Sequence, residues 1–162
     1  MHIKLINKQL HFDNYKVKCA VGKRGISKFK KEGDNCTPKG TFKFKKLLIR
    51  NDRVKNLKAN IEKLLIKKNM GWCDDSKSNH YNKLIKFPFK YSAEKLYKKE
   101  NIYDIILIMD YNLSPVIKKR GSAIFLHIAT KNYNPTQGCV AVSKNNMRKL
   151  LKYISKKTKI TI

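Results

Sequence analysis

Acidic residues and arginine are both scarce in this sequence. Its 162 residues include 11 Asp and Glu against 38 Lys and Arg, and only five of the 38 are Arg. Surfaces that read bases or grip phosphates favour Arg, whose planar guanidinium donates hydrogen bonds in pairs. The lysines are spread along the whole chain, so we interpret most of the net charge of +27 as a solvated surface and expect no specific nucleic-acid site. Attraction to an anionic polymer, such as nucleic acid or cell wall, would still follow from the charge.

Long apolar runs are absent as well. No run approaches the ~20 apolar residues of a membrane-spanning helix, so we expect no transmembrane segment. The N-terminal stretch MHIKLINKQLHFDNY has no apolar core long enough for a signal peptide, and no export signal is visible. A hydrophobic fraction of 41% is nevertheless too high for a disordered chain, and the length suits a single domain, residues 1–162.

Closely spaced cysteine pairs are also missing. The four cysteines, Cys19, Cys36, Cys73 and Cys139, form no C-x-x-C pair, which argues against a zinc ribbon or a thioredoxin-type site. The segment GWCDDSKSNHYN, residues 71–82, mixes Cys, Asp and His, but its spacing matches no zinc pattern. We therefore expect no metal site.

Strand patterns dominate what is present. Polar and apolar residues alternate in the early segments, and the later ones are nearly continuous aliphatic runs, which is typical of strands buried on both faces. The expected strands are 2–6, 15–21, 41–49, 102–111, 122–129, 138–142 and 158–162.

Helical patterns are few. Apolar residues at helical spacing predict an amphipathic helix over 144–155, with Ser143 as its N-cap. Residues 93–101 could form one short helix, and 57–65 has helical spacing without a clear cap. The region 71–91 is rich in turn formers and aromatics, as expected of an ordered loop. The fold class is therefore mainly β, with one helix packed on the strands.

His127 and Cys139 are the residues with the clearest chemical potential. Each alone is usually structural, but His127 ends one expected strand and Cys139 begins the next, with 11 residues between them. A neighbouring imidazole can take the proton of a thiol and stabilise the thiolate. Gly138 permits unusual backbone angles and leaves room for a substrate carbonyl, and backbone N–H groups there could form an oxyanion hole. These residues favour a cysteine acyl-transfer or hydrolase site.

Several phrases, in order, resemble the YkuD-type L,D-transpeptidase catalytic domain. They are TPKGTF at 37–42, preceded by KKEGDNC, then GWCDD at 71–75, YN at 81–82, RGSAIFLH at 120–127 and FLHIATKNYNPTQGCVAVS at 125–143. The resemblance runs from about Val21 to Ile162, and the phrases are most similar to a compact, single-domain branch. It implies an L,D-transpeptidase-like β-sandwich or mixed sheet with the helix packed on it.

The resemblance assigns roles to particular residues. Cys139 matches the nucleophile, Gly138 its preceding glycine and His127 the general base. Thr136 stands where the family has Ser or Thr. We count Thr136 and Gln137 as substrate-binding residues.

Departures from the family pattern occur around the same site. Gln137 replaces a frequent second His, and Ala141 replaces a frequent Arg. Ile128 and Ala129 stand where many members have Gly and then Ser or Thr. Arg120 could replace the missing Arg as a clamp for a carboxylate, since it lies just ahead of the histidine strand.

The motif at 71–82 suggests one wall of a substrate site. Trp72 offers a flat face, and Asp74 and Asp75 could hold an ammonium group such as that of a diaminopimelate side chain. Tyr81 and Asn82 are assigned to the same wall. The alternative is a well-packed loop in which the aspartates serve as turn and cap residues.

The resemblance implies an enzyme that needs no organic cofactor and acts on peptidoglycan stem peptides as donor and acceptor. A thioester on the nucleophile would pass to an amine of a second stem, or to water in a carboxypeptidase or amidase. The expected location is the periplasm or cell envelope, and the expected state is a monomer. A non-enzymatic basic protein that binds an anionic polymer and a degenerate, inactive relative remain alternatives.

Overall fold

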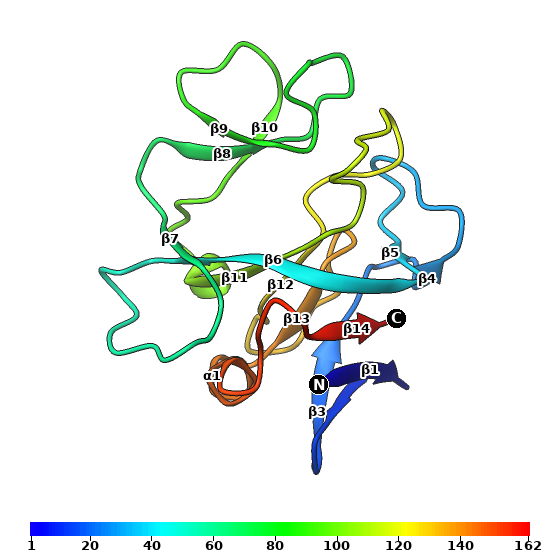
Figure 1. Cartoon of the computed structure of the whole chain (residues 1–162). Coiled ribbons are helices and arrows are strands. Elements are labelled where there is room, and N and C mark those ends of the chain that lie inside the picture. Colours follow the sequence, from blue (N-terminus) through cyan, green and yellow to red (C-terminus); the bar gives the residue numbers. More distant parts are fainter.

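A computed structural model describes residues 1–162 as a mainly β protein with one α-helix (Figure 1). The strands are β1 His2–Ile6, β2 Gln9–Phe12, β3 Tyr15–Ala20, β4 Ile26–Ser27, β5 Thr37–Pro38, β6 Thr41–Ile49, β7 Lys63–Leu65, β8 Met70–Cys73, β9 Leu84–Lys86, β10 Ala93–Lys95, β11 Ile105–Met109, β12 Phe125–Ile128, β13 Val140–Val142 and β14 Lys159–Thr161. The helices are the 3₁₀-helix η1 Asn101–Tyr103 and the α-helix α1 Lys144–Leu151. The expected mainly β class is confirmed.

The largest sheet closes on itself. Its order is β11-β12-β13-β3-β2-β1-β14-β6-β7, and β6 also pairs with β11, which completes a ring. The nine-residue strand β6 makes this closure possible: residues 41–43 pair with β14, and residues 44–49 pair with β11. The sheet is mixed, as expected, because β1–β14, β12–β13 and β6–β7 run parallel while the other neighbours are antiparallel. The expected β-sandwich is replaced by a closed, barrel-like sheet.

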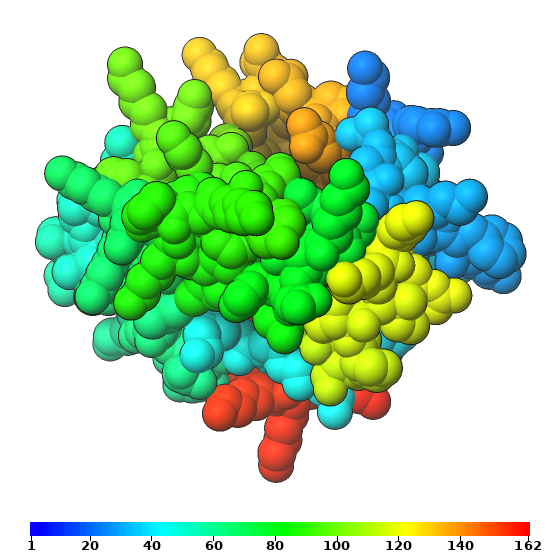
Figure 2. All heavy atoms as spheres, turned by 90° about the horizontal axis from the view of Figure 1, so that it is seen from above, coloured from blue at the N-terminus to red at the C-terminus, as the bar shows by residue number.

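A second sheet lies over one end of this barrel. Its three strands have the order β10-β8-β9, and Figure 1 shows them above the barrel. Seen from above in Figure 2, the green residues of this region cover much of the molecule, next to the orange segment that precedes β13. We call the strands β8, β9 and β10 with their connecting loops, residues 70–95, the upper sheet. The expected ordered loop over 71–91 thus contains two of its strands.

Helix α1 begins where the sequence predicts. The Ser143 side chain accepts a hydrogen bond from the backbone N–H of Asn146, and Met147, Leu150 and Leu151 are buried. The helix ends at Leu151, four residues earlier than expected, and Ile154 still packs in the core from the following turn. No helix in this fold has both the length and the apolar character needed to cross a bilayer.

Three expected elements differ in the structure. Residues 93–101 form no α-helix, because Ala93–Lys95 pairs with β8 as strand β10. Residues 57–65 end in strand β7 beside β6, and residues 7–14, which lie between two expected strands, contain the further strand β2. In each case pairing with a distant or neighbouring strand overrides a weak local preference.

Strands β12 and β13 divide their side chains between two cores. Leu126 and Ile128 face the main cluster inside the barrel, together with Val140 and Val142. Phe125 belongs to a smaller cluster on the other face, beneath the upper sheet. Because strand side chains alternate, His127 lies on the same face as Phe125. This face carries the candidate site.

Candidate active site

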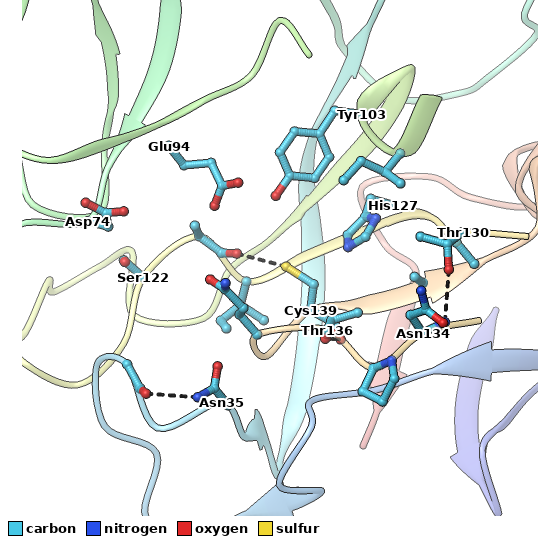
Figure 3. Close-up of a pocket in the computed structure, with 18 of the residues that line it drawn as sticks. Asn35, Asp74, Glu94, Tyr103, Ser122, His127, Thr130, Asn134, Thr136 and Cys139 are labelled. Atoms are coloured by element: carbon cyan, nitrogen blue, oxygen red, sulfur yellow. Dashed lines mark hydrogen bonds between the residues drawn. The ribbon is translucent and has the colours of Figure 1, made fainter. Parts of the chain in front are cut away.

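A cavity of about 270 Å³ opens between the barrel and the upper sheet. Cys139 and His127 both line it, and Figure 3 shows them from strands that run side by side. The parallel register pairs Leu126 with Val140 and His127 with Ala141, so Cys139 lies opposite Phe125. His127 is two residues further along on the same face. Parallel strands joined by the 129–138 connection thus place the thiol and the imidazole on one face, in the lining of the same cavity.

The sulfur of Cys139 is held by backbone groups. The thiol donates to the carbonyl of Ala123 at 3.1 Å and accepts from the N–H of Phe125 at 3.3 Å. Only 9% of the residue is exposed. Ala123 has a φ of 52°, an uncommon value for a residue with a Cβ, and this conformation accompanies the placement of its carbonyl beside the sulfur. The Phe125 N–H is positioned to stabilise a thiolate when one forms.

The imidazole of His127 has a defined tautomer. Its Nδ1 lies 2.9 Å from the backbone oxygen of Ile128, and a carbonyl oxygen can only accept. Nδ1 therefore carries the proton, and Nε2 keeps its lone pair. The ring also packs edge-on against Tyr103, with centroids 5.3 Å apart. The histidine is thus fixed in the form that can receive a proton at Nε2.

Burial keeps both groups neutral in the resting protein. It raises the pKa of the Cys139 thiol to about 12, because the charged thiolate is poorly solvated there. The same effect lowers the pKa of His127 below its usual value, only partly opposed by the Ile128 carbonyl. At pH 7 the site therefore holds a thiol and a neutral imidazole, and proton transfer must accompany the attack on a substrate.

The loop before the nucleophile is packed tightly against the TPKGTF motif. Thr136 Oγ1 donates to the carbonyl of Cys139 at 2.6 Å and accepts from the N–H of Gly138 at 3.1 Å. Thr37 Oγ1 lies 3.5 Å from the same carbonyl. Gly138 has a φ of 142°, and a Cβ there would lie 2.9 Å from the carbonyl oxygen of Cys36. Glycine is needed at 138 both for its backbone angle and for this close approach.

The wall opposite His127 is polar and acidic. Figure 3 shows Asp74, Ser122 and Glu94 on the other side of the Cys139 sulfur from the histidine. Glu94 comes from strand β10 and forms an ion pair with Lys98 at 2.7 Å. Asp74 Oδ1 is buried without a hydrogen-bond partner, and the hydroxyl of Ser122 lies beside that of Tyr81. The cavity therefore has a basic nitrogen on one side and carboxylates on the other.

Trp72, Tyr81 and Asn82 lie outside the cavity lining, although the sequence assigned them to substrate. All three are buried, at 2–5% exposure. Asn82 Oδ1 accepts from Trp72 Nε1 at 2.9 Å and from the N–H of Ala123 at 3.0 Å. Tyr81 donates to Glu32 and accepts from the N–H of Gly121. Through these bonds they position the 121–123 segment that touches the sulfur.

Some of the other expected site residues line the cavity, and the rest lie outside it. Thr136, Gln137 and Asp74 line the cavity. Asp75 does not, and its carboxylate accepts from the N–H of Lys77 in a turn. Arg120 is exposed and also lies outside the lining.

The positions at which this sequence departs from the family pattern have different structural consequences. Ala129 and Ala141 both line the cavity, so small side chains leave space there. Ile128 points into the barrel core, and only its carbonyl serves the site. The side chain at 128 is therefore free to be apolar.

Sequence reasoning missed Glu94, Tyr103, Ser122 and Lys30, which also line the cavity. Glu94 fell in a segment expected to be helical. The sequence offered one indication of its importance: acidic residues are scarce, at 11 against 38 basic residues. Ser122 lies inside the RGSAIFLH phrase. Lys30 lies inside the KKEGDNC phrase, and Tyr103 carried no signal that distinguishes it from a core residue.

Of the comparisons with known proteins, one found a match. The model of the YkuD family, described as the L,D-transpeptidase catalytic domain, matches residues 5–162. No curated protein and no solved structure matches the chain. The structure brings together no group of three or more His, Cys, Asp or Glu side chains that could hold a metal ion.

Proposed function

Because the chain belongs to the L,D-transpeptidase catalytic domain family, we propose that it is a cysteine acyltransferase acting on peptidoglycan stem peptides. The observation that carries the proposal is that a nearly buried thiol and a histidine, whose Nδ1 is held by the Ile128 carbonyl, line one cavity on one face of parallel strands. The first half of the reaction forms a thioester on Cys139, and the second passes the acyl group to an amine of another stem.

Acylation begins with both groups neutral. The Cys139 thiol leaves the Ala123 carbonyl and gives its proton to His127 Nε2 as the sulfur attacks a peptide carbonyl. The C–S bond forms, and the oxyanion is held by backbone N–H groups, for which we assign that of Cys139. His127 then returns the proton to the leaving amine, and the C–N bond breaks. The departing peptide leaves a thioester and a neutral imidazole.

Transfer uses the same groups in reverse. An acceptor amine attacks the thioester carbon, and His127 takes a proton from the attacking nitrogen. Collapse breaks the C–S bond, and the sulfur recovers a proton from the imidazolium. The Phe125 N–H, 3.3 Å from the sulfur, supports the leaving thiolate. Water in place of the amine would give hydrolysis.

The fold supports transfer to a large acceptor. The cavity continues past Ile102, Ala129 and Thr130 into a neighbouring groove on the His127 side. A second stem approaching along this groove would bring its amine to the imidazole. We also propose work at the cell envelope, where this substrate occurs and where a net charge of +27 favours retention on an anionic wall.

The test is incubation of the purified protein with muropeptides, followed by mass spectrometry of the products. We expect cross-linked or trimmed stems from the wild type and none from Cys139→Ala. Cys19→Ala is the matched control, since this thiol is also buried and has a pKa raised to about 12, but packs in the main core. Inactive wild type, or an active Cys139→Ala protein, contradicts the proposal.

A further inference from the structure

Two neighbouring loops combine exposed apolar side chains with basic ones. We call residues 23–31 and 114–120 the basic loops, since they hold five and three Lys and Arg and no Asp or Glu. Directly after the first loop, the backbone N–H of Glu32 donates to the carbonyl of Lys119 at 2.9 Å. Figures 1 and 2 show the two segments, blue and yellow, side by side at one edge of the molecule. The basic loops therefore form one continuous surface.

Phe29 in the first loop is the most exposed large apolar side chain of the protein. Its exposed fraction is 84%, whereas the other exposed large apolar residues lie between 38% and 48%. Two of those others, Ile26 and Ile117, are also on the basic loops. Single exposed apolar residues are common on protein surfaces, but three on adjoining loops make a patch that favours a binding partner.

The first loop buries a lysine and exposes a phenylalanine, which reverses their usual solvation. Lys30 is only 8% exposed, forms an ion pair with Asp34, and packs its stem against Gly121. The backbone N–H of Phe29 donates to Ser27 Oγ at 3.0 Å, which fixes the turn that precedes this lysine. The loop is thus held by internal contacts in a conformation that keeps an aromatic side chain in solvent.

The surroundings of the apolar patch are strongly positive. Seven basic side chains of the basic loops are exposed, namely Lys23, Arg24, Lys28, Lys31, Lys118, Lys119 and Arg120. None of the seven forms an ion pair within the protein. Glu32 and Asp34, which follow the first loop, are bonded to other side chains. The positive charge of the surface is therefore available to an anionic partner.

An anionic lipid bilayer fits this combination of side chains. Apolar residues insert at the level of the headgroups, and the Lys and Arg around them bind lipid phosphates. An anionic polymer would need only the charge. Surfaces that stack sugars or bases use several aromatic faces, whereas two of the three apolar residues here are isoleucines.

We propose that the basic loops dock the protein on the surface of an anionic phospholipid bilayer, with Phe29 inserted among the headgroups. Ile26 and Ile117 lie on either loop beside it, and the exposed basic residues contact lipid phosphates. None of these three apolar residues lines the active-site cavity, so the inference is independent of the acyltransferase proposal. Glu32 and Gly33, which continue the first loop, do line the cavity, so docking would hold its opening near the bilayer.

The test is co-sedimentation of the protein with vesicles of equal parts phosphatidylglycerol and phosphatidylcholine. Phe29→Ser should weaken binding by roughly tenfold, as expected when one aromatic side chain is withdrawn from the bilayer. Leu65→Ser is the matched control and should bind like wild type, since Leu65 is 48% exposed on β7, at the other side of the barrel in Figure 1. Equal binding by wild type and Phe29→Ser overturns the proposal, as does equally strong binding of wild type to pure phosphatidylcholine.

Paired charge reversals separate the basic loops from the net charge of +27, which attracts any anionic surface. Lys118→Glu with Lys119→Glu should weaken binding more than Lys67→Glu with Lys68→Glu. All four lysines are exposed, and the two double changes alter the net charge equally. Equal losses would show that diffuse charge drives binding, as it would for any anionic polymer, and would overturn the proposal.

Tryptophan in place of Phe29 reports insertion directly. The emission of Phe29→Trp should shift to shorter wavelength on the anionic vesicles and be quenched by lipids with brominated acyl chains, after subtraction of the signal of the buried Trp72. Leu65→Trp should show neither change. Unchanged emission of Phe29→Trp contradicts insertion. In size-exclusion chromatography without lipid, a dimer that Phe29→Ser abolishes would show that this face joins two copies of the chain and would also contradict the proposal.

Discussion

The barrel and the upper sheet contribute to one cavity in different ways. The barrel supplies Cys139 and His127 from adjacent strands, where the parallel hydrogen-bond register fixes their relation. The upper sheet, which lies over the barrel, supplies Asp74 directly after β8 and Glu94 from β10. Its link to the 121–123 segment depends on individual side chains, chiefly Asn82, whose amide makes four hydrogen bonds.

Under the proposed function, the barrel would carry the chemistry and the upper sheet would contribute to recognition. A nucleophile and its base tolerate little displacement. Paired strands whose other face packs in the main core hold such residues in nearly fixed positions. Recognition of a substrate group can be placed on an added sheet, which changes without altering the barrel. We therefore expect damage to the barrel site to abolish turnover, and damage to the upper sheet to change selectivity and stability.

The largest effect is expected from His127→Gln. Glutamine is similar in size but cannot accept the thiol proton, so acylation should slow by about 10² to 10⁴, the usual contribution of a general base. Single-turnover acylation followed by mass spectrometry measures it. His80→Gln is the control, since His80 is exposed and packs beside Phe89. A His127→Gln protein with nearly normal rates would show that another group is the base.

A smaller effect is expected from Asn82→Ala, which tests the attachment of the upper sheet. The substitution leaves the Trp72 Nε1–H and the Ala123 N–H unpaired, and it places alanine at a φ of 56°. Each buried unpaired group costs about 1–3 kcal/mol. Urea unfolding should show this loss, with faster hydrogen exchange in residues 70–95. Asn79→Ala, an exposed change in the same segment, should leave stability unchanged.

Alkylation of Cys139, which needs no substitution, should rise steadily with pH. Because burial raises the pKa of this thiol to about 12, its thiolate fraction should rise about tenfold per pH unit from pH 7 to 10. Iodoacetamide labelling at Cys139, read by peptide mass mapping, measures the slope. A plateau starting near neutral pH would instead reveal a preformed thiolate–imidazolium pair on the barrel side.

Much of the barrel, and the candidate residues His127 and Cys139, could be predicted from the sequence. Alternating and continuous apolar runs located β6, β11, β12 and β14, because burial on one or both faces dictates those patterns. Ser143 and the apolar positions behind it located the start of α1. His127, Gly138 and Cys139 could be named because the motif that holds them is contiguous. All of these are local properties of the chain.

The tertiary structure decided what depends on distant segments. Ring closure requires β6 to pair at both edges, which no local pattern encodes. Strand β10 was mistaken for helix because its partner β8 lies 20 residues earlier, and this error hid Glu94. The sequence by itself identified the residues that we propose for the chemistry. Only the fold decided that burial raises the pKa of the thiol, that the Ile128 carbonyl holds Nδ1 of His127, and that Asp74 and Glu94 line the same cavity, because burial and hydrogen-bond partnership arise when separate segments pack together.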